Sequence, residues 1–95
     1  MIVERWTWEV RPDNQSEVIE SLKALVKALG FTPRICTYRF GAVDKVVSDI
    51  EFESFLDREK WWEGVDRNLP EYLAWIEKQS DLTEAGRTCE LLIVH

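Results

Sequence analysis

The chain has 95 residues, of which 45% are hydrophobic, and its formal net charge is −6. The length and composition predict one domain over residues 1–95 with a compact core. The negative charge argues against nucleic acid and anionic membranes as partners, because both require a basic surface. We expect neither a signal peptide after Met1 nor a membrane span, since no apolar run approaches the necessary length.

Residues 2–10 are predicted to form a strand, because apolar and polar side chains alternate with a period of two. The apolar face carries Ile2, Trp6, Trp8 and Val10, with Glu4 near the fraying end. The two tryptophans are therefore expected in the core rather than in an aromatic ligand box. Pro12 ends the strand, since proline has no N–H for the ladder.

A helix is predicted over residues 15–29, where apolar side chains recur at helical spacing. Asn14 and Glu17 predict a capping box at its start. Gly30 fits the left-handed position that follows a helix end, and Phe31 supplies the hydrophobic contact that accompanies it.

Residues 33–40 and 46–53 predict two strands joined by a short turn containing Gly41, which is typical of a hairpin. In the first of these two strands, residues 33–40, successive side chains alternate between the two faces of the sheet. We expect one face to carry Cys36, Tyr38 and Phe40, and the other Ile35, Thr37 and Arg39. In the third strand, Ile50 and Phe52 are expected to face the helices, whereas Asp49 and Glu51 face away.

A second helix is predicted over residues 54–68, with Ser54 and Asp57 as its N-terminal cap. Its apolar face is expected to carry Phe55, Leu56, Trp62 and Val65. Trp61 and Trp62 are adjacent and are not expected to point inward together. The sequence does not decide which of them faces inward and which lies at a pocket lip or dimer seam.

A third helix is predicted from Pro70, which suits the first helical turn, to about Leu82. Residues 83–86 are expected to form a loop, and residues 87–94 a last strand. Right-handed crossovers then give an α+β fold of βαββααβ order with helices on one face. The expected antiparallel sheet has four strands in the order 4-1-3-2. Cys36 and Cys89 would lie on opposite edges, as buried, unpaired thiols of a reducing cytoplasm.

The sheet face turned away from the helices mixes branched apolar side chains with charged ones. A second copy of the chain would cover it and form a barrel-like interior, so we predict a homodimer. The alternative is the solvated sheet face of a monomer.

The chain resembles the dimeric α/β-barrel superfamily, which has a ferredoxin-like fold, and within it the NIPSNAP-type small proteins. The resemblance rests on the strand and helix order and on three segments: residues 38–41, residues 46–54 and the Trp61-Trp62 pair. It implies a homodimer with a cavity between sheet and helices. It implies no single activity, because the superfamily includes monooxygenases, isomerases, haem enzymes and proteins of unknown role.

The open face is predicted to hold more acids than bases, with Glu9, Asp49, Glu51 and Glu90 against Arg5 and Arg39. Enclosed by a partner, the surplus acid would need a compensating cation or a protonated carboxyl group. Glu51, nearest the strand centre, is the candidate general base. Alternatively, cross-strand pairs join Arg5 to Glu51 or Glu90, and Arg39 to Asp49. The predicted ligand-binding residues are Arg5, Tyr38, Arg39, Asp49 and Glu51.

His95 is the only histidine and the last residue, so we expect no metal or haem site and no cofactor. The sequence thus predicts a homodimer that binds a small molecule of unknown identity. The alternative is a cofactor-independent enzyme of monooxygenase or isomerase type that uses the barrel cavity. Whether the chain is an enzyme is not decided by these features.

Overall fold

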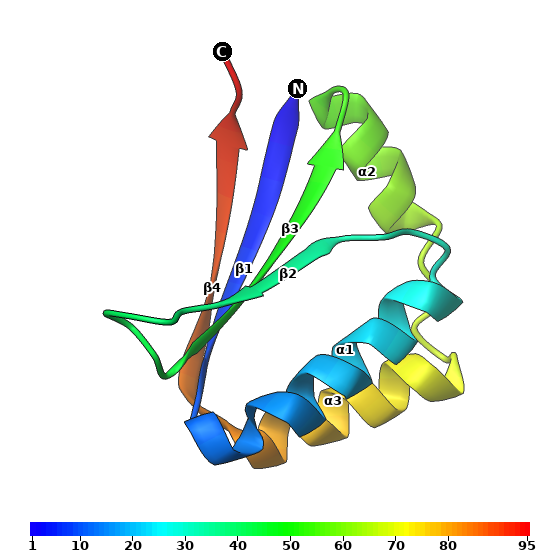
Figure 1. The fold of residues 1–95 in the computed structure, drawn as a ribbon. Coiled ribbons are helices and arrows are strands. Elements are labelled where there is room, and N and C mark those ends of the chain that lie inside the picture. The colour runs from blue at the N-terminus through cyan, green and yellow to red at the C-terminus, as the bar shows by residue number, and fades with distance from the viewer.

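The structure, a computed structural model, describes residues 1–84 and 87–95. Its elements follow the predicted βαββααβ order, with one short 3-10 helix added before the first α-helix (Figure 1). In chain order they are β1 (Ile2–Val10), η1 (Pro12–Asn14), α1 (Gln15–Ala28), β2 (Arg34–Thr37), β3 (Lys45–Phe52), α2 (Phe55–Glu63), α3 (Pro70–Leu82) and β4 (Thr83–Ile93).

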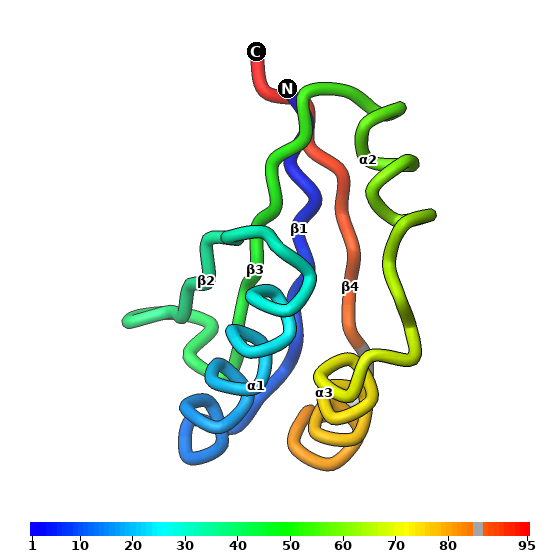
Figure 2. Tube along the Cα trace, turned by 90° about the vertical axis from the view of Figure 1, so that its right-hand side faces the viewer, coloured from blue at the N-terminus to red at the C-terminus, as the bar shows by residue number. Residues whose placement is uncertain are grey.

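The four strands form one antiparallel sheet in the order β2-β3-β1-β4. This is the predicted order read from the opposite edge, and the α+β class is confirmed. The two views of the chain place α1, α2 and α3 on one side of this sheet (Figures 1 and 2). Cys36 on β2 and Cys89 on β4 therefore lie on opposite edges, and both are free. Both are exposed as residues, so the prediction that they are buried was wrong. Cys36 lies on the open face of the sheet, and the Cys89 thiol is only partly covered.

The core lies between the sheet and the α1–α3 pair. Its buried members are Trp8, Val10, Val18, Leu22, Leu25, Val26, Val46 and Trp75. Trp8 meets Trp75 edge to face, with ring centroids 5.3 Å apart. Each such side chain contributes roughly 1.5–3 kcal/mol when it is fully buried. The prediction that Trp6 and Trp8 face the helices is confirmed, with Trp6 partly buried beside the core.

Specific hydrogen bonds fix both ends of α1. Gly30 has a φ of 81°, and the amides of Gly30 and Phe31 donate to the carbonyls of Lys27 and Val26. This is the predicted glycine-terminated helix end. The predicted capping box is wrong, because Asn14 has helical dihedrals and makes no side-chain cap bond. Instead, the side-chain amide of Gln15 donates to the carbonyl oxygens of Val10 and Val43 at 3.1 and 2.7 Å.

Ser54 caps α2 as predicted, since its Oγ accepts the Asp57 amide at 3.1 Å. The helix is shorter than expected, however, and its predicted apolar face is right for Trp62 and Val65 but wrong for Phe55 and Leu56. Phe55 and Leu56 are 51% and 58% exposed, whereas Arg58 and the tryptophans that follow it turn toward the sheet. The reason is a buried carboxylate under α2, described below. Leaving that charge unpaired costs more than exposing two apolar side chains.

The second strand differs most from its prediction. It ends at Thr37, and its faces are inverted, because Ile35 aligns with Ser48 and Cys36 with Val47. Ile35 therefore packs against the core, while Cys36 lies on the open face. A shift of one residue exchanges the two faces of a strand, and both faces of this strand carry apolar side chains. Its alternation therefore could not fix the register.

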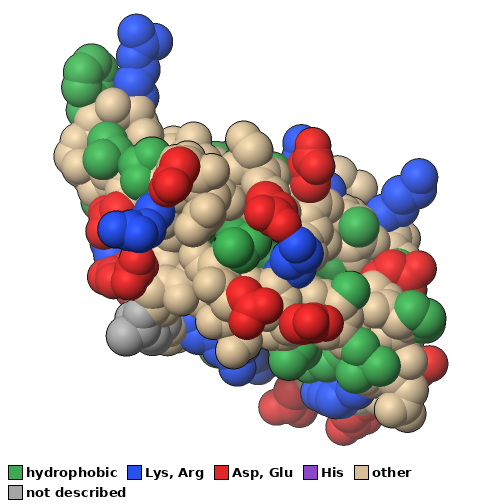
Figure 3. All heavy atoms as spheres, turned by 90° about the horizontal axis from the view of Figure 1, so that it is seen from below, with side chains coloured by type: hydrophobic (Ala, Val, Ile, Leu, Met, Phe, Trp, Pro, Cys, Tyr) green, Lys and Arg blue, Asp and Glu red, His purple; other side chains and the backbone are tan. Residues whose placement is uncertain are grey.

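The last strand begins at Thr83, directly after α3. The predicted loop was wrong at residues 83 and 84, and its Ala85 and Gly86 lie outside the described residues. From below, where α1 and α3 lie, acidic and basic side chains surround scattered hydrophobic ones (Figure 3). This pattern is typical of a helix layer in contact with water. Within residues 1–84 and 87–95, no helix is long and apolar enough to cross a membrane.

Candidate functional site

A cavity of about 230 Å³ lies between the sheet and the helices. All five tryptophans of the chain line it, namely Trp6, Trp8, Trp61, Trp62 and Trp75. Aliphatic side chains of α1 complete the apolar part of the wall, and the polar groups are few. Such a cavity, apolar with a few convergent polar groups, is the usual form of a small-molecule site.

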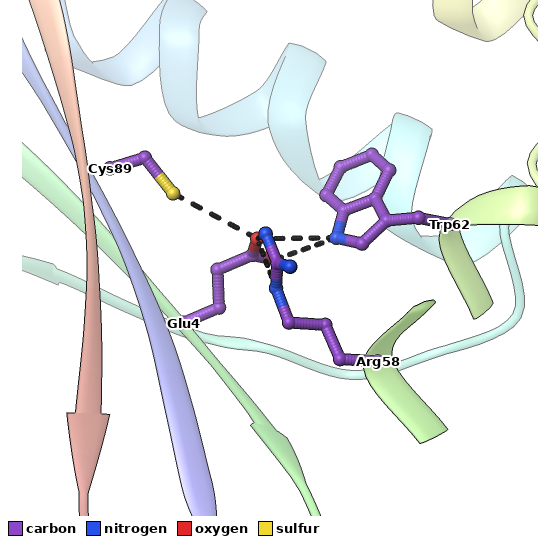
Figure 4. Close-up of polar contacts among 4 residues, drawn as sticks. All are labelled: Glu4, Arg58, Trp62 and Cys89. Carbon is purple, nitrogen blue, oxygen red and sulfur yellow. Dashed lines mark hydrogen bonds and ion pairs between the residues drawn. The ribbon is translucent and has the colours of Figure 1, made fainter. Parts of the chain in front are cut away.

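Glu4 of β1 is the polar centre of this cavity and is 0% exposed. Its Oε1 accepts hydrogen bonds from Arg58 Nε at 3.0 Å and Arg58 Nη2 at 2.7 Å. The indole N–H of Trp62 donates to both carboxylate oxygens, at 3.2 and 3.1 Å. Figure 4 shows these side chains converging from β1 and α2. The carboxylate is thus neutralised by one guanidinium, and each of its oxygens accepts a hydrogen bond.

The position of Arg58 and Trp62 follows from helix geometry. They are four residues apart on α2 and so lie one above the other on the same face. The N-terminal cap at Ser54 fixes where that face begins. The strand and the helix therefore place an acid, a base and an indole N–H together over a distance of more than 50 residues in sequence.

Cys89 on β4 joins the same group, with its Sγ 3.8 Å from Glu4 Oε1 (Figure 4). Partial desolvation of the thiol raises the pKa of Cys89, and the negative charge of Glu4 raises it further. Both effects disfavour the thiolate. Cys89 is therefore a weak hydrogen-bond donor to Glu4 and not an activated nucleophile.

A second polar group lies in the wall formed by α3 and β4. Gln79 Oε1 accepts from Trp8 Nε1 at 2.7 Å and from Arg87 Nη1 at 3.0 Å. The Arg87 guanidinium carbon lies 5.3 Å from the centroid of the Trp6 ring, which is cation–π geometry. All four of these side chains line the cavity, so Arg87 brings a second positive charge to it.

Trp61 and Trp62 both line the cavity, which corrects the prediction that only one points inward. Their rings meet edge to face with centroids 4.9 Å apart. Trp61 also packs edge to face on Phe31, at 4.6 Å. The side chains of adjacent helical residues point about 100° apart, but both indoles are large enough to reach the same cavity from the two sides of the helix.

The residues predicted to bind a ligand lie elsewhere. Arg5 and Asp49 form a bidentate pair on the open face, with both N–O distances 2.9 Å. The hydrogen bond to Asp49 and then its charge raise the pKa of Arg5. Asp49 is thus paired with Arg5, and the alternative pairings of Arg5 with Glu51 or Glu90 are wrong. Glu51 is exposed on the same face, opposite Val3.

Tyr38 and Arg39 follow the end of β2 and are exposed. The Arg39 guanidinium carbon lies 5.8 Å from the centroid of the Phe40 ring, so the predicted Arg39–Asp49 pair is wrong. The structure therefore brings Arg5, Asp49 and Glu51 together on the sheet but leaves Arg39 on the loop. The predicted surplus of acid is also smaller, since Arg34 aligns with Asp49 and Lys45 pairs with Glu9 at 3.0 Å.

Sequence reasoning missed Glu4, Arg58 and Trp62, although one signal for them was present. Glu4 lies on the face that carries Ile2 and Trp8, so strict alternation places a carboxylate among buried side chains. A charge in that position requires a partner. Arg58 and Trp62, four residues apart on the second predicted helix, offered such partners. Among the described residues, no cluster of three His, Cys, Asp or Glu side chains could hold a metal ion.

Neither a family model nor a curated protein matches the chain, but solved structures do. A NIPSNAP family protein from Agrobacterium tumefaciens is 17% identical, with a TM-score of 0.75 over 99% of this chain and 85% of that chain. A NIPSNAP-like domain protein from Burkholderia xenovorans is 18% identical, with a TM-score of 0.77 over 99% and 84%. An antibiotic biosynthesis monooxygenase is 9% identical, with a TM-score of 0.68 over 100% and 99%. The predicted resemblance is confirmed for the fold.

Proposed function

We propose that this protein is a homodimer that binds a small, largely apolar molecule between its sheet and helices. The observation that carries the proposal is the tryptophan-lined cavity of about 230 Å³ around a buried, fully paired carboxylate. A chain without a ligand to bind would gain stability by filling this space with side chains. The apolar walls would supply affinity, and the few polar groups would orient the ligand.

Filling the cavity from its rim tests this proposal. Ile76 lines the cavity, while Leu73 on the same helix does not, and both are exposed. We expect Ile76→Trp to abolish binding of the neutral probe 1-naphthalenemethanol in calorimetry, whereas Leu73→Trp binds it as the unmodified protein does. Equal binding by the two variants would place the probe outside the cavity and contradict the proposal.

The dimer is supported by the open face of the sheet. Leu92 and Val94 are exposed there beside the Arg5–Asp49 pair, and the fold resembles dimeric α/β barrels. We expect Leu92→Lys to shift sedimentation from dimer to monomer at micromolar concentration, since it places a charge in an apolar contact. The matched change on the helix side, Leu73→Lys, leaves the dimer intact. A monomer in the unmodified protein contradicts this part of the proposal.

A catalytic alternative is supported by the likeness to the monooxygenase fold. In that reading, two open faces enclose a second space, and Glu51 acts as the general base of a cofactor-independent monooxygenase- or isomerase-like reaction. Glu4 is a poor base, because four hydrogen bonds already occupy its oxygens. Glu51→Gln separates the two functions. If it leaves ligand binding in the cavity around Glu4 unchanged, and the bound molecule is not converted, the non-catalytic function is favoured.

We also propose that residues 1–95 form one domain and that the protein works in a reducing cytoplasm. The location is supported by two free cysteines on opposite edges of the sheet, which suit a compartment without disulfides. Thiol titration of the denatured, non-reduced protein is expected to find both thiols. Absence of free thiols contradicts the assignment.

A further inference from the structure

We infer that the ligand of this cavity is a planar monoanion, an aromatic carboxylate or phenolate, with its charge held between Arg58 and Arg87. The inference rests on the proposed binding function and adds the chemical class of the ligand. It is carried by three features of the wall: its size, its charge and its uncommitted hydrogen-bond donors.

The size and the wall chemistry define the body of the ligand. An apolar cavity of about 150 Å³ takes up benzene, and this cavity of about 230 Å³ is therefore large enough for one or two fused rings. Pockets for drug-sized ligands measure about 300–1,000 Å³, so a longer molecule would not be enclosed in this cavity. Five indole rings in the wall favour offset or edge-to-face packing on a flat aromatic body.

The charge of the wall is opposite in sign to that of the protein. The chain as a whole carries −6, but the cavity is lined by one acid, Glu4, and two bases, Arg58 and Arg87. Glu4 and Arg58 neutralise each other through direct hydrogen bonds. Arg87 bonds only to the neutral amide of Gln79 among the described residues that line the cavity. One positive charge therefore remains for a ligand.

The donors left over in the wall also point to an anionic oxygen. Arg58 donates through Nε and Nη2 to Glu4, and no hydrogen bond from its Nη1 is found within residues 1–84 and 87–95. Gln79 accepts two hydrogen bonds through its oxygen, which leaves its amide group as a donor. The carboxylate of Glu4, the one acid in the wall, already accepts four hydrogen bonds and is paired with Arg58. The unused donors of Arg58 and Gln79 therefore favour an anionic oxygen on the ligand.

Tryptophan-lined sites can also bind cations through the faces of their rings. Here Arg87 already lies over the Trp6 ring, so that position is occupied by a cation of the protein itself. A ligand cation would also meet the guanidinium of Arg58, and the one carboxylate in the wall is already paired with that guanidinium. The observations therefore favour an anion over a cation.

Three probes of one shape separate the possibilities in calorimetry at fixed salt: 1-naphthoate, neutral 1-naphthalenemethanol and cationic 1-naphthylmethylamine. We expect 1-naphthoate to bind roughly 10-fold or more tightly than the neutral probe, the effect of a hydrogen bond to a charged group. The cation is expected to bind weakest. Equal or tighter binding of the neutral or cationic probe overturns the inference but leaves the binding function standing. Failure of all three to bind overturns both.

Variants then assign the charge to its residues. Arg87→Gln is expected to weaken 1-naphthoate binding roughly 10-fold and to leave 1-naphthalenemethanol binding unchanged. Arg67→Gln removes the same charge from an exposed loop outside the cavity and serves as the control. Glu4→Gln removes the negative charge and is expected to tighten 1-naphthoate binding. An Arg87→Gln variant that binds 1-naphthoate like its Arg67→Gln control would overturn the assignment, and so would weaker binding by a folded Glu4→Gln variant.

Discussion

The guanidinium of Arg58 on α2 donates two hydrogen bonds, of 3.0 and 2.7 Å, to one oxygen of the wholly buried Glu4 carboxylate on β1. This contact joins the short helix α2 to the sheet, next to the packing of Trp61 on Phe31. It also places a charge pair in the wall of the one cavity that all the tryptophans share. Fold stability and the candidate site therefore depend on the same two residues.

Removal of Arg58 is expected to be strongly destabilising. Arg58→Met leaves Glu4 buried without a counter-charge, which costs about 3–5 kcal/mol in the free energy of unfolding. The double variant Glu4→Gln/Arg58→Met removes both charges and is expected to recover more than half of that loss. Urea unfolding at fixed protein concentration measures both values. A single variant as stable as Arg67→Met would mean that Glu4 does not need its partner.

The indole N–H of Trp62 is expected to contribute separately from its ring. Trp62→Phe leaves the carboxylate with fewer donors and is expected to lower the free energy of unfolding by about 1–3 kcal/mol beyond the packing loss. Trp61→Phe is the matched control, because Trp61 packs on Phe31 without a hydrogen bond to Glu4. Equal losses in the two variants would assign the effect of Trp62 to packing alone.

The raised pKa of Cys89 predicts a pH dependence in a Cys36→Ser background. Since only the thiolate reacts with iodoacetamide, the native protein should reach its half-maximal rate at a higher pH than the urea-unfolded chain. Glu4→Gln is expected to lower that midpoint, because it removes a cause of the shift. The linked stability is present below the pKa of the unfolded thiol and is lost as pH rises through the raised pKa. A native midpoint at or below the unfolded one contradicts the partial desolvation of the thiol beside Glu4.

The end of α1 offers a test of the backbone. Gly30 has a φ of 81° with nothing near the position of a Cβ atom, so Gly30→Ala costs only the left-handed strain, about 1–2 kcal/mol. Gly64 ends α2 with a φ of −82°, and an added Cβ would make ordinary contacts. Gly64→Ala is therefore expected to be neutral or slightly stabilising. Thermal unfolding compares the two, and equal destabilisation would contradict the assigned conformations.

The order of elements, the sheet order and the glycine-terminated helix could be predicted because each follows from local pattern or connection rules. The faces of β2 could not be predicted, because apolar side chains lie on both faces of this strand. Its register depends on the pairing of Ile35 with Ser48 on the neighbouring strand. The extent of α2 was overestimated because an apolar stripe implied helix beyond Gly64. Contacts between residues far apart in sequence determine both the register of β2 and the length of α2.

Of the candidate site residues predicted from the sequence, those on the sheet lie on the face opposite the tryptophan-lined cavity, for a related reason. The prediction followed the charged side chains of the open face, where Arg5 and Asp49 form an ion pair. The cavity instead surrounds a single acid, Glu4, whose partners come from a helix far away in sequence. Alternation could place Glu4 among buried side chains, but it could not show that Arg58 would cover it.

The most direct test of the account is a ¹H–¹⁵N correlation spectrum of the protein titrated with 1-naphthoate. If the ligand binds between the sheet and the helices, the indole N–H signal of Trp62 and the amides of Glu4 and Gln79 shift together, while the amides of Val3, Val47 and Leu92 on the open face do not. Shifts confined to those open-face amides, with the indole signals unmoved, would contradict the claim that the ligand site lies between the sheet and the helices.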